Sequence, residues 1–200
     1  MPPPLPFPYA IRVGTDIVRI SRIARLLRGR HGARFVERVL APDERARLRP
    51  AVQDAVARLE TPPPPLFKTL GESAEGGGDG DDGTDVGEEG HHRLATYLAG
   101  RWAAKEAAIK AHPHLRLGFH DILILAGTEA KSGSGGGDGR EDRDRRDSAP
   151  TALIKASQTD PAARDQMAVV SISHDSDYAT AVCIGFDPGM ASGVDQMKGS

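Results

Sequence analysis

The sequence predicts an α+β fold in which one strand is followed by several helices and then by a run of strands. A segment with alternating apolar residues opens this pattern at 11–20, and a long Ala-rich helix at 92–111 precedes the last strands. Strands that follow one another after a group of helices favour an antiparallel sheet over alternating parallel units. The length of 200 residues fits a single domain over 1–200, with some chain left for insertions.

The strand at 11–20 has two unlike faces. One face carries mostly β-branched side chains, those of Ile11, Val13, Thr15 and Ile17. The other face carries Gly14, Asp16 and Val18. A carboxylate among apolar strand neighbours is disfavoured by burial unless it meets a cation or hydrogen-bond donors. We therefore expect Asp16 to have a partner from another part of the chain.

Helical stretches follow this strand. Apolar spacing predicts a helix over 21–27 with Ser21 as its N-cap, and a second helix over 34–40. A third helical stretch covers 43–60 and contains Pro50. Proline removes a backbone donor and clashes with the preceding turn, so this stretch should kink or divide there.

The long helix at 92–111 is the strongest helix prediction. Its large apolar side chains fall within one arc at 100° per residue, those of Leu94, Leu98, Trp102 and Ile109. Pro113 should end it.

Strands are predicted after this helix at 121–126, 151–156, 168–173 and 178–186. Residues 174–177 join the last two through a four-residue connection rich in turn formers, which favours an antiparallel hairpin. The single cysteine, Cys183, lies in the last apolar run, where a small buried side chain would fit.

Two Gly-rich stretches interrupt the pattern. Residues 71–92 hold eight carboxylates, eight glycines and no Lys or Arg, and residues 132–147 hold four Arg and five acidic residues. Such compositions bury too little apolar surface to offset the entropy of ordering, so both are expected to be disordered insertions. The core of the domain is then expected at about 10–70, 92–131 and 149–188.

The charge balance differs between these stretches and the core. The whole chain has a formal charge of −2, but outside the two stretches 22 Lys and Arg stand against 15 Asp and Glu. This excess favours an anionic partner such as a phosphate ligand or an acidic protein, and no nucleic-acid partner is expected. One cysteine and the lack of a long apolar run predict an intracellular protein, cytoplasmic or mitochondrial, with no membrane partner.

Glu106 lies at the flank of the apolar arc of the long helix, where burial should be partial. The simplest hypothesis is an exposed ion pair with Lys110, one turn further along. If the helix packs on the strand of Asp16, the two carboxylates could instead hold Mg2+, with waters and phosphate oxygens as its other ligands. Oxygen ligands favour magnesium over zinc, because the chain has no Cys pair and its His residues are scattered.

Other signals for chemistry are weaker. His174 ends a predicted strand, and such a residue is a turn or surface group more often than a catalyst. The sequence has no P-loop, no GxGxxG fingerprint and no GxSxG elbow. The common nucleotide-binding and hydrolase classes therefore lose their main support.

Four segments, at 13–23, 34–44, 97–111 and 169–182, together resemble the holo-acyl-carrier-protein synthase family, the small 4'-phosphopantetheinyl transferases. The motifs that carry the resemblance are Gly-x-Asp, Trp-Ala-Ala-Lys-Glu-Ala-x-x-Lys and Ser-x-Ser-His, in that order. The resemblance implies a small antiparallel sheet packed on a long helix. It also implies transfer of phosphopantetheine from coenzyme A to a serine of an apo acyl carrier protein, with release of adenosine 3',5'-bisphosphate.

The resemblance assigns roles at the transfer end of the site. Asp16 and Glu106 become ligands of Mg2+, and Lys110 lies near the transferring phosphate. The serine oxygen attacks the β-phosphorus of coenzyme A. Asp175, Glu106 and a water on the metal are candidates for accepting the serine proton.

The resemblance also assigns residues to the end of the site that binds the nucleotide part of coenzyme A. Arg101 corresponds to an arginine that contacts the 3'-phosphate of coenzyme A, and His174 lies by the same nucleotide end. Lys105 is expected to be structural or at the rim. No contact is transferred to 111–122, where many relatives have a Gly-rich stretch near the pyrophosphate.

Arginines on the first helices dock the acidic carrier in this family, and those positions are Arg22, Arg30 and Arg38. The resemblance implies a homotrimer with active sites between neighbouring subunits. Two alternatives remain: a carrier-binding subunit that has lost the transfer, and a Mg-dependent nucleotide hydrolase, which needs no basic docking face. The sequence does not identify which carrier protein is modified.

Overall fold

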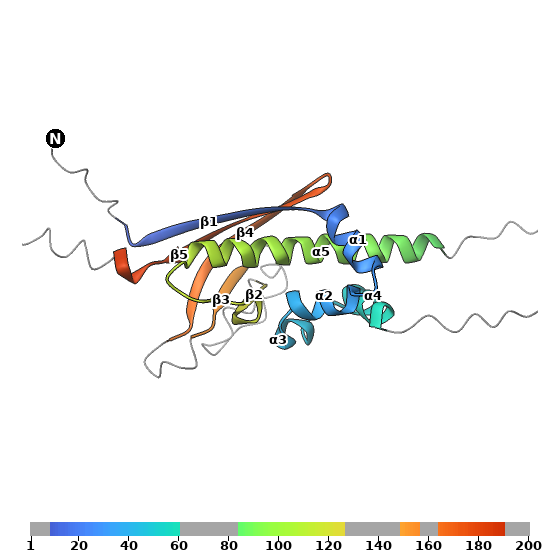
Figure 1. The fold of residues 1–200 in the computed structure, drawn as a ribbon, viewed down its shortest axis with the longest axis horizontal. Coiled ribbons are helices and arrows are strands. Elements are labelled where there is room, and N and C mark those ends of the chain that lie inside the picture. The colour runs from blue at the N-terminus through green and yellow to red at the C-terminus, as the bar shows by residue number, and fades with distance from the viewer. Residues whose placement is uncertain (1–8, 61–83, 127–148, 157–163, 191–200) are drawn as a thin grey trace, which may run out of the picture.

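Five antiparallel strands form one sheet that packs on one long helix (Figure 1). The computed structural model describes residues 9–60, 84–126, 149–156 and 164–190. In chain order the elements are β1 (Ile11–Arg19), α1 (Ile20–Arg28), α2 (Gly32–Val39), α3 (Pro42–Arg45), α4 (Pro50–Glu60), α5 (Thr84–Ala111), the short 3-10 helix η1 (Phe119–Asp121), β2 (Ile122–Leu125), β3 (Thr151–Ile154), β4 (Gln166–Asp175) and β5 (Tyr178–Phe186). The predicted α+β class and all five predicted strands are confirmed.

The strands lie in the order β1-β5-β4-β3-β2, and every neighbouring pair is antiparallel. The face of β1 that carries Gly14, Asp16 and Val18 turns inward, as the alternation predicts, and its β-branched face is exposed. On β5 the inward positions include Ala181 and Cys183, both fully buried. Burial raises the pKa of the Cys183 thiol to about 11, so this cysteine is a packing residue, as predicted.

Helix α5 lies between the sheet and the shorter helices. Figure 1 shows β1 on one side of α5 and α2, α3 and α4 on the other, and α5 contacts β1, β5, α1 and α4. Small side chains permit this burial on several sides, because the alanines of the helix are fully buried: Ala95, Ala99, Ala103, Ala104, Ala107, Ala108 and Ala111. Leu94 and Leu98 of the predicted arc are buried, and Trp102 and Ile109 pack against the core.

Helix α5 begins earlier than the sequence predicts. It starts at Thr84 instead of His92, so residues 84–92 of the expected insertion are helical. Surface charges stabilise this extra length: Glu89 pairs with Arg93 one turn on, and Glu88 accepts a hydrogen bond from Arg28 of α1 at 3.0 Å. Residues 71–83 and 132–147, the rest of the two expected insertions, lie outside the described residues. No helix in the described parts of the chain is long and apolar enough to cross a membrane.

The third helical stretch divides at its proline, as expected. Helix α3 ends at Arg45, and Pro50 is the first residue of α4. Proline is tolerated at a first helical position because the N–H that it lacks would have no partner within the helix there.

The start of α1 differs from the prediction. Ser21 is not the N-cap, because α1 begins at Ile20 directly after β1. The cap comes from the hairpin between β4 and β5: Asp177 Oδ1 and Oδ2 accept hydrogen bonds from Ser21 N and Oγ, each at 2.7 Å, and Asp177 O accepts one from Ile20 N.

The connection at 174–177 is shorter than predicted, because β4 continues to Asp175. It leaves a two-residue turn whose first residue, Ser176, has a φ of 49°.

We expect this cap to make stability depend on acid pH. Hydrogen bonds from Ser21 lower the pKa of Asp177 below its usual value. The charged carboxylate therefore stabilises the fold above a pH of about 4, and this contribution is lost as the pH falls through the lowered pKa. Urea unfolding between pH 2 and 6 should show a smaller acid loss in Asp177→Asn than in the unchanged chain. Asp54→Asn, at an exposed position of α4, is the control, and equal acid slopes for D177N and the unchanged chain would contradict the prediction.

Candidate active site

Asp16 and Lys110 meet where β1 crosses α5. The side chain of Asp16 is only 17% exposed, and its Oδ1 accepts a hydrogen bond from Lys110 Nζ at 2.8 Å. The same ammonium donates to Thr15 O at 2.9 Å. The cation that this half-buried strand carboxylate requires is thus a lysine from α5. Lys110 pairs with Asp16 across the two elements, and not with Glu106 along the helix as the simplest hypothesis had it.

A glycine allows this crossing to be so close. Gly14 lies two residues before Asp16 on the same inward face of β1, and a Cβ atom added to it would lie 2.0 Å from Ala107 O and 2.6 Å from Ala111 N. No side chain fits in that space. The Gly-x-Asp spacing therefore brings β1 against α5 and turns the carboxylate toward the same helix.

Glu106 lies one turn before Lys110 on α5 and is half-buried, as predicted. Within the described parts of the chain its carboxylate has no hydrogen bond or ion pair. It follows directly on Lys105 and precedes Ala107, the residue that meets Gly14. The crossing of β1 and α5 therefore offers one carboxylate from each element and a lysine one turn after Glu106 on the helix.

The donor set fits magnesium better than zinc. Among the described residues there is no cluster of three or more His, Cys, Asp or Glu side chains. Zinc sites in proteins usually have three or four such ligands, whereas Mg2+ is commonly held by one or two carboxylates with water and phosphate oxygens completing six positions. Asp16 and Glu106 match the second pattern.

Arg101 lies at a pocket of about 450 Å³ between α3, α5 and β2. Its guanidinium stacks over the ring of Tyr97, 5.0 Å from the ring centroid, and its Nη1 donates to Ile124 O. Arg47 and Arg49 line the same pocket. Two carboxylates, Asp43 and Glu44, line it as well. Three arginines outnumber them and suit a phosphate group, which guanidinium groups bind through paired, charge-assisted hydrogen bonds.

His174 lies against α5 at Gly100, the residue before Arg101. A Cβ atom added to Gly100 would lie 2.9 Å from His174 Nε2, so the imidazole occupies the space above this glycine. Gly100 and Lys110 are ten helical residues apart, which is about 15 Å along the axis. Two of the predicted site residues, Lys110 and His174, thus lie at two ends of one strip, the side of α5 that faces the inward sides of β1 and β4.

Asp175 is not part of this strip. It is the last residue of β4, is exposed, and accepts a 3.5 Å hydrogen bond from Ser176 Oγ. Within the described residues it has no hydrogen bond or ion pair with Asp16, Glu106 or Lys110. The structure therefore joins Asp16 to Lys110 and brings His174 beside Gly100, the residue before Arg101, but leaves Asp175 at the exposed end of β4.

Lys105 is fully buried, which excludes the rim position that was one of its two predicted locations. It forms an ion pair with Glu44, a residue to which the sequence analysis gave no role. A signal for this burial was present, because Lys105 lies three residues after Trp102 and four before Ile109, on the apolar arc of α5. The pocket arginines Arg47 and Arg49 were also missed, because nothing in the local sequence relates them to Arg101.

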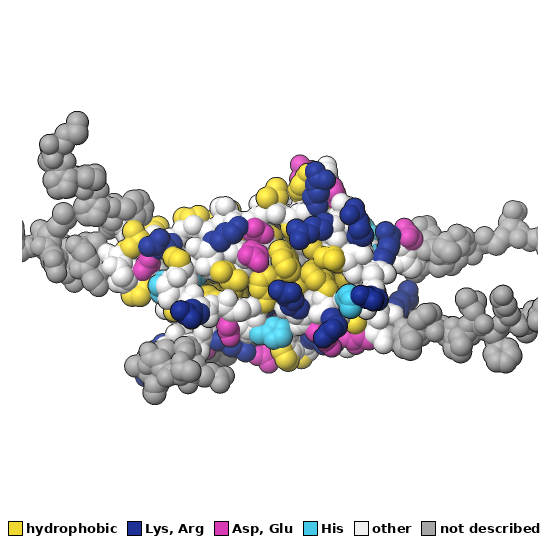
Figure 2. All heavy atoms as spheres, viewed as in Figure 1, with side chains coloured by type: hydrophobic (Ala, Val, Ile, Leu, Met, Phe, Trp, Pro, Cys, Tyr) yellow, Lys and Arg dark blue, Asp and Glu magenta, His cyan; other side chains and the backbone are white. Residues whose placement is uncertain are grey.

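The predicted docking arginines are exposed. Arg22 lies on α1, Arg38 on α2, and Arg30 between them, where its Nε donates to His31 Nε2 at 2.9 Å. Three more exposed arginines accompany them, Arg25, Arg28 and Arg34. Figure 2 shows basic side chains gathered over the part of the surface that α1 and α2 form.

The sequence is similar to known proteins over most of its length, although no family model matches it. The mitochondrial 4'-phosphopantetheinyl transferase B of Aspergillus fumigatus is 31% identical over 183 residues, which covers 90% of this chain and 96% of that protein. The holo-(acyl-carrier-protein) synthase of Corynebacterium efficiens is 38% identical over 93 residues, 46% of this chain and 63% of that protein.

Solved structures of similar proteins cover most of the chain. A complex of ACPS with CoA from Chronobacterium ammoniagenes is 23% identical, covers 89% of this chain and 98% of that chain, and has a TM-score of 0.48. The holo-ACP-synthase from Plasmodium yoelii is 19% identical, covers 90% and 96%, and has a TM-score of 0.47.

Proposed function

This chain belongs to the 4'-phosphopantetheinyl transferase family, which includes the holo-(acyl-carrier-protein) synthases, and from that premise we propose how its residues perform the reaction. The chain transfers phosphopantetheine from coenzyme A to a carrier protein. The observation that carries this function is similarity over 96% of a curated transferase. The crossing of β1 and α5 supplies two carboxylates and a lysine, the groups that a phosphoryl transfer uses.

Asp16 and Glu106 would hold Mg2+. Support comes from their origin on two elements in contact, from the partial burial of both, and from the lack of any described partner for Glu106. When bound, the ion would neutralise negative charge on the pyrophosphate of coenzyme A. Lys110 adds a positive charge beside the carboxylates and so favours a phosphoryl group at this end of the strip.

In the proposed reaction the serine Oγ of the carrier forms a bond to the β-phosphorus of coenzyme A. The bond between that phosphorus and the oxygen that bridges it to the α-phosphorus breaks, and adenosine 3',5'-bisphosphate leaves with the electron pair. Of the two candidates on this chain for taking the serine proton, Glu106 lies one turn from Lys110, whereas Asp175 lies at the exposed end of β4, so we favour Glu106.

Arg101 and His174 would hold the nucleotide end of coenzyme A, with the 3'-phosphate at Arg101. The pocket of about 450 Å³ beside Arg101 supports this, because Arg47 and Arg49 add positive charge and Tyr97 fixes the guanidinium. The separation of about 15 Å along α5 keeps this end apart from Lys110, where the transfer takes place.

The carrier protein would dock on the arginines of α1 and α2, the predicted set being Arg22, Arg30 and Arg38. An acidic partner fits this surface, because opposite charges speed association and orient the two proteins. The mitochondrial location in the name of the Aspergillus relative favours the mitochondrial of the two predicted compartments.

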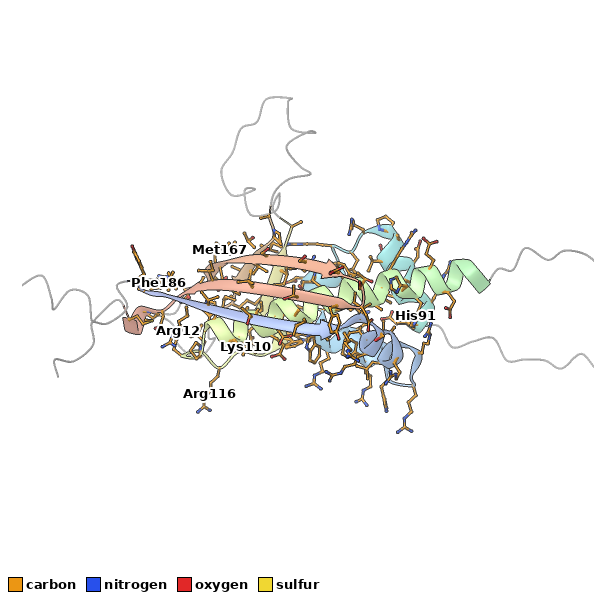
Figure 3. All side chains as sticks on the ribbon, turned by 90° about the horizontal axis from the view of Figure 1, so that it is seen from above. Arg12, His91, Lys110, Arg116, Met167 and Phe186 are labelled. Carbon is orange, nitrogen blue, oxygen red and sulfur yellow. The ribbon has the colours of Figure 1, made fainter. Side chains whose placement is uncertain are left out.

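We infer that the chain assembles as the homotrimer expected from its sequence. The outward face of the sheet supports this, because Val13, Ile184 and Val169 align across β1, β5 and β4 and are 58%, 41% and 60% exposed. Figure 3 views the sheet from this side, with Met167 and Phe186 toward one end. Apolar patches of this kind mark interfaces. Light scattering should give a trimer mass, and Val13→Asp should lower it; a monomer mass for the unchanged chain would contradict the assembly.

The test of the function is the intact mass of an apo acyl carrier protein after incubation with this chain, coenzyme A and Mg2+, with and without a chelator. We expect the carrier to gain one phosphopantetheine, and we expect the chelator to prevent it. No gain on several carriers, with coenzyme A still bound, would instead indicate a carrier-binding subunit without transfer activity. Release of phosphopantetheine into water without any carrier would indicate a nucleotide hydrolase.

A further inference from the structure

We propose that Glu44, together with Lys105, is a positioning residue that sets the guanidinium of Arg101 for the 3'-phosphate of coenzyme A. The inference rests on the proposed function, in which Arg101 contacts that phosphate. Glu44 is among the residues that line the pocket, but its side chain is only 4% exposed and that of Lys105 is fully buried, so both would act from beneath the pocket surface. Their effect would pass through the edge of the sheet.

Glu44 uses both of its oxygens to join separate segments. Its Oε2 accepts a hydrogen bond from Ala41 N at 2.9 Å and forms the ion pair with Lys105 Nζ. Its Oε1 accepts a hydrogen bond from Ile124 N at 3.1 Å. Lys105 Nζ also donates to Phe119 O at 2.8 Å. The pair therefore connects the start of α3, the C-terminal part of α5, η1 and β2.

Stability alone does not explain this pair. The side chains of Lys105 and Glu44 are 0% and 4% exposed, and burial lowers the pKa of Lys105, although Glu44 opposes that effect. Taking two charges out of water costs about as much free energy as their attraction returns, and apolar residues of similar size often stabilise a fold equally well. What the pair provides that apolar residues lack is a directed acceptor for two backbone N–H groups, those of Ala41 and Ile124.

The N–H of Ile124 belongs to the edge of the sheet. Strand β2 is the last strand and pairs only with β3, where Ile124 lies opposite Ala152. The N–H and C=O of Ile124 that point away from β3 have no strand partner there. Glu44 accepts the N–H and Arg101 donates to the C=O, so one residue of β2 connects the carboxylate to the guanidinium.

Arg101 is thereby held from two directions. The ring of Tyr97 lies under its guanidinium, and Ile124 O accepts from Nη1, while Glu44 fixes Ile124 itself. A guanidinium held in one orientation loses less entropy when it binds a phosphate. Without the carboxylate, Ile124 N–H would lose its acceptor, β2 could shift, and Arg101 would lose its fixed direction. Misplacement by about 1 Å can cost about 100-fold in a reaction that depends on orientation.

The experiment measures kcat/KM of the full-length chain for coenzyme A and for 3'-dephospho-coenzyme A, and takes the ratio. Arg101→Gln should lower this ratio about 10- to 100-fold, the range for loss of a hydrogen bond to a charged group. Glu44→Gln should lower it about 10-fold, mainly through the KM for coenzyme A. Because Glu44 acts through Arg101, the double variant should have the ratio of Arg101→Gln alone.

A second variant keeps the test independent of stability. In Glu44→Leu with Lys105→Met the buried charges are gone and the volume is largely kept, so the chain should fold. The ratio of the two kcat/KM values should still be lowered in this double variant, because Ile124 N–H has no acceptor. Asp187→Asn is the matched control. It removes a buried carboxylate that pairs with Arg12 at the opposite end of the sheet, and the ratio should stay unchanged.

Two results would overturn the inference. In the first, both Glu44 variants have the same ratio of kcat/KM values as the unchanged chain, while Arg101→Gln has a lowered ratio. The other is an unchanged ratio in Arg101→Gln, which also removes the role of Arg101. Both are distinct from failure of the proposed function, in which no variant and not even the unchanged chain would transfer phosphopantetheine at all.

Discussion

Phosphopantetheinyl transfer is expected to fall by about 100- to 1,000-fold when Glu106 is replaced by Gln. The proposed Mg2+ site needs a negative charge from both β1 and α5, and a metal contributes several kcal/mol to the stabilisation of transferring phosphoryl oxygens. The amide of Gln has nearly the same size but no charge. Because no described residue pairs with the Glu106 carboxylate, its loss should leave the free energy of unfolding almost unchanged.

The measurement is the rate of carrier modification as a function of Mg2+ concentration, beside urea unfolding of the same proteins. In E106Q more Mg2+ should be needed for half of the remaining rate. Glu89→Gln is the matched control, because Glu89 lies on the same helix and forms only an exposed pair with Arg93. A rate in E106Q equal to that of the unchanged chain would remove Glu106 from the metal site.

The sheet was predictable because its signals are local. Alternation of side chains defines β5 at 178–186, and the structure has the same bounds. The start of α5 was not predictable in this way, because the acidic, Gly-rich composition before His92 is typical of disordered chain. The bonds that accompany the helix there include one from Glu88 to Arg28 of α1, and such a contact between distant residues is invisible to composition.

In the candidate site, too, local features were predictable and contacts between distant residues were not. The composition of β1 indicated that Asp16 needs a cation, and this is confirmed, but the local spacing of α5 paired Lys110 with Glu106 instead. Only the crossing of the two elements decides which carboxylate the lysine reaches. The ion pair of Glu44 with Lys105 joins residues 61 positions apart, so no periodicity could reveal the partner even though the buried position of Lys105 lay on the apolar arc.

Gly14→Ala should destabilise the fold strongly, by about 3 kcal/mol or more. The new Cβ would lie 2.0 Å from Ala107 O and 2.6 Å from Ala111 N, closer than atoms can approach. Both obstacles are backbone atoms of a long buried helix, so they cannot swing aside as the end of a side chain could. Overpacking of a close-packed core usually costs about 1–3 kcal/mol, and a clash between two backbones belongs at the upper end or beyond it.

Gly90→Ala is the control for this change, because nothing lies within 4 Å of the added Cβ at that position of α5. Alanine favours a helix over glycine, so G90A should stabilise the chain by about 0.5–1 kcal/mol in the urea unfolding that measures both variants. Where G14A still folds, β1 must move away from α5, and the 2.8 Å bond between Asp16 and Lys110 should be lost with most of the transfer activity. If G14A unfolds at the same urea concentration as the unchanged chain, β1 and α5 are not in close contact. Asp16, Glu106 and Lys110 could then no longer form one site.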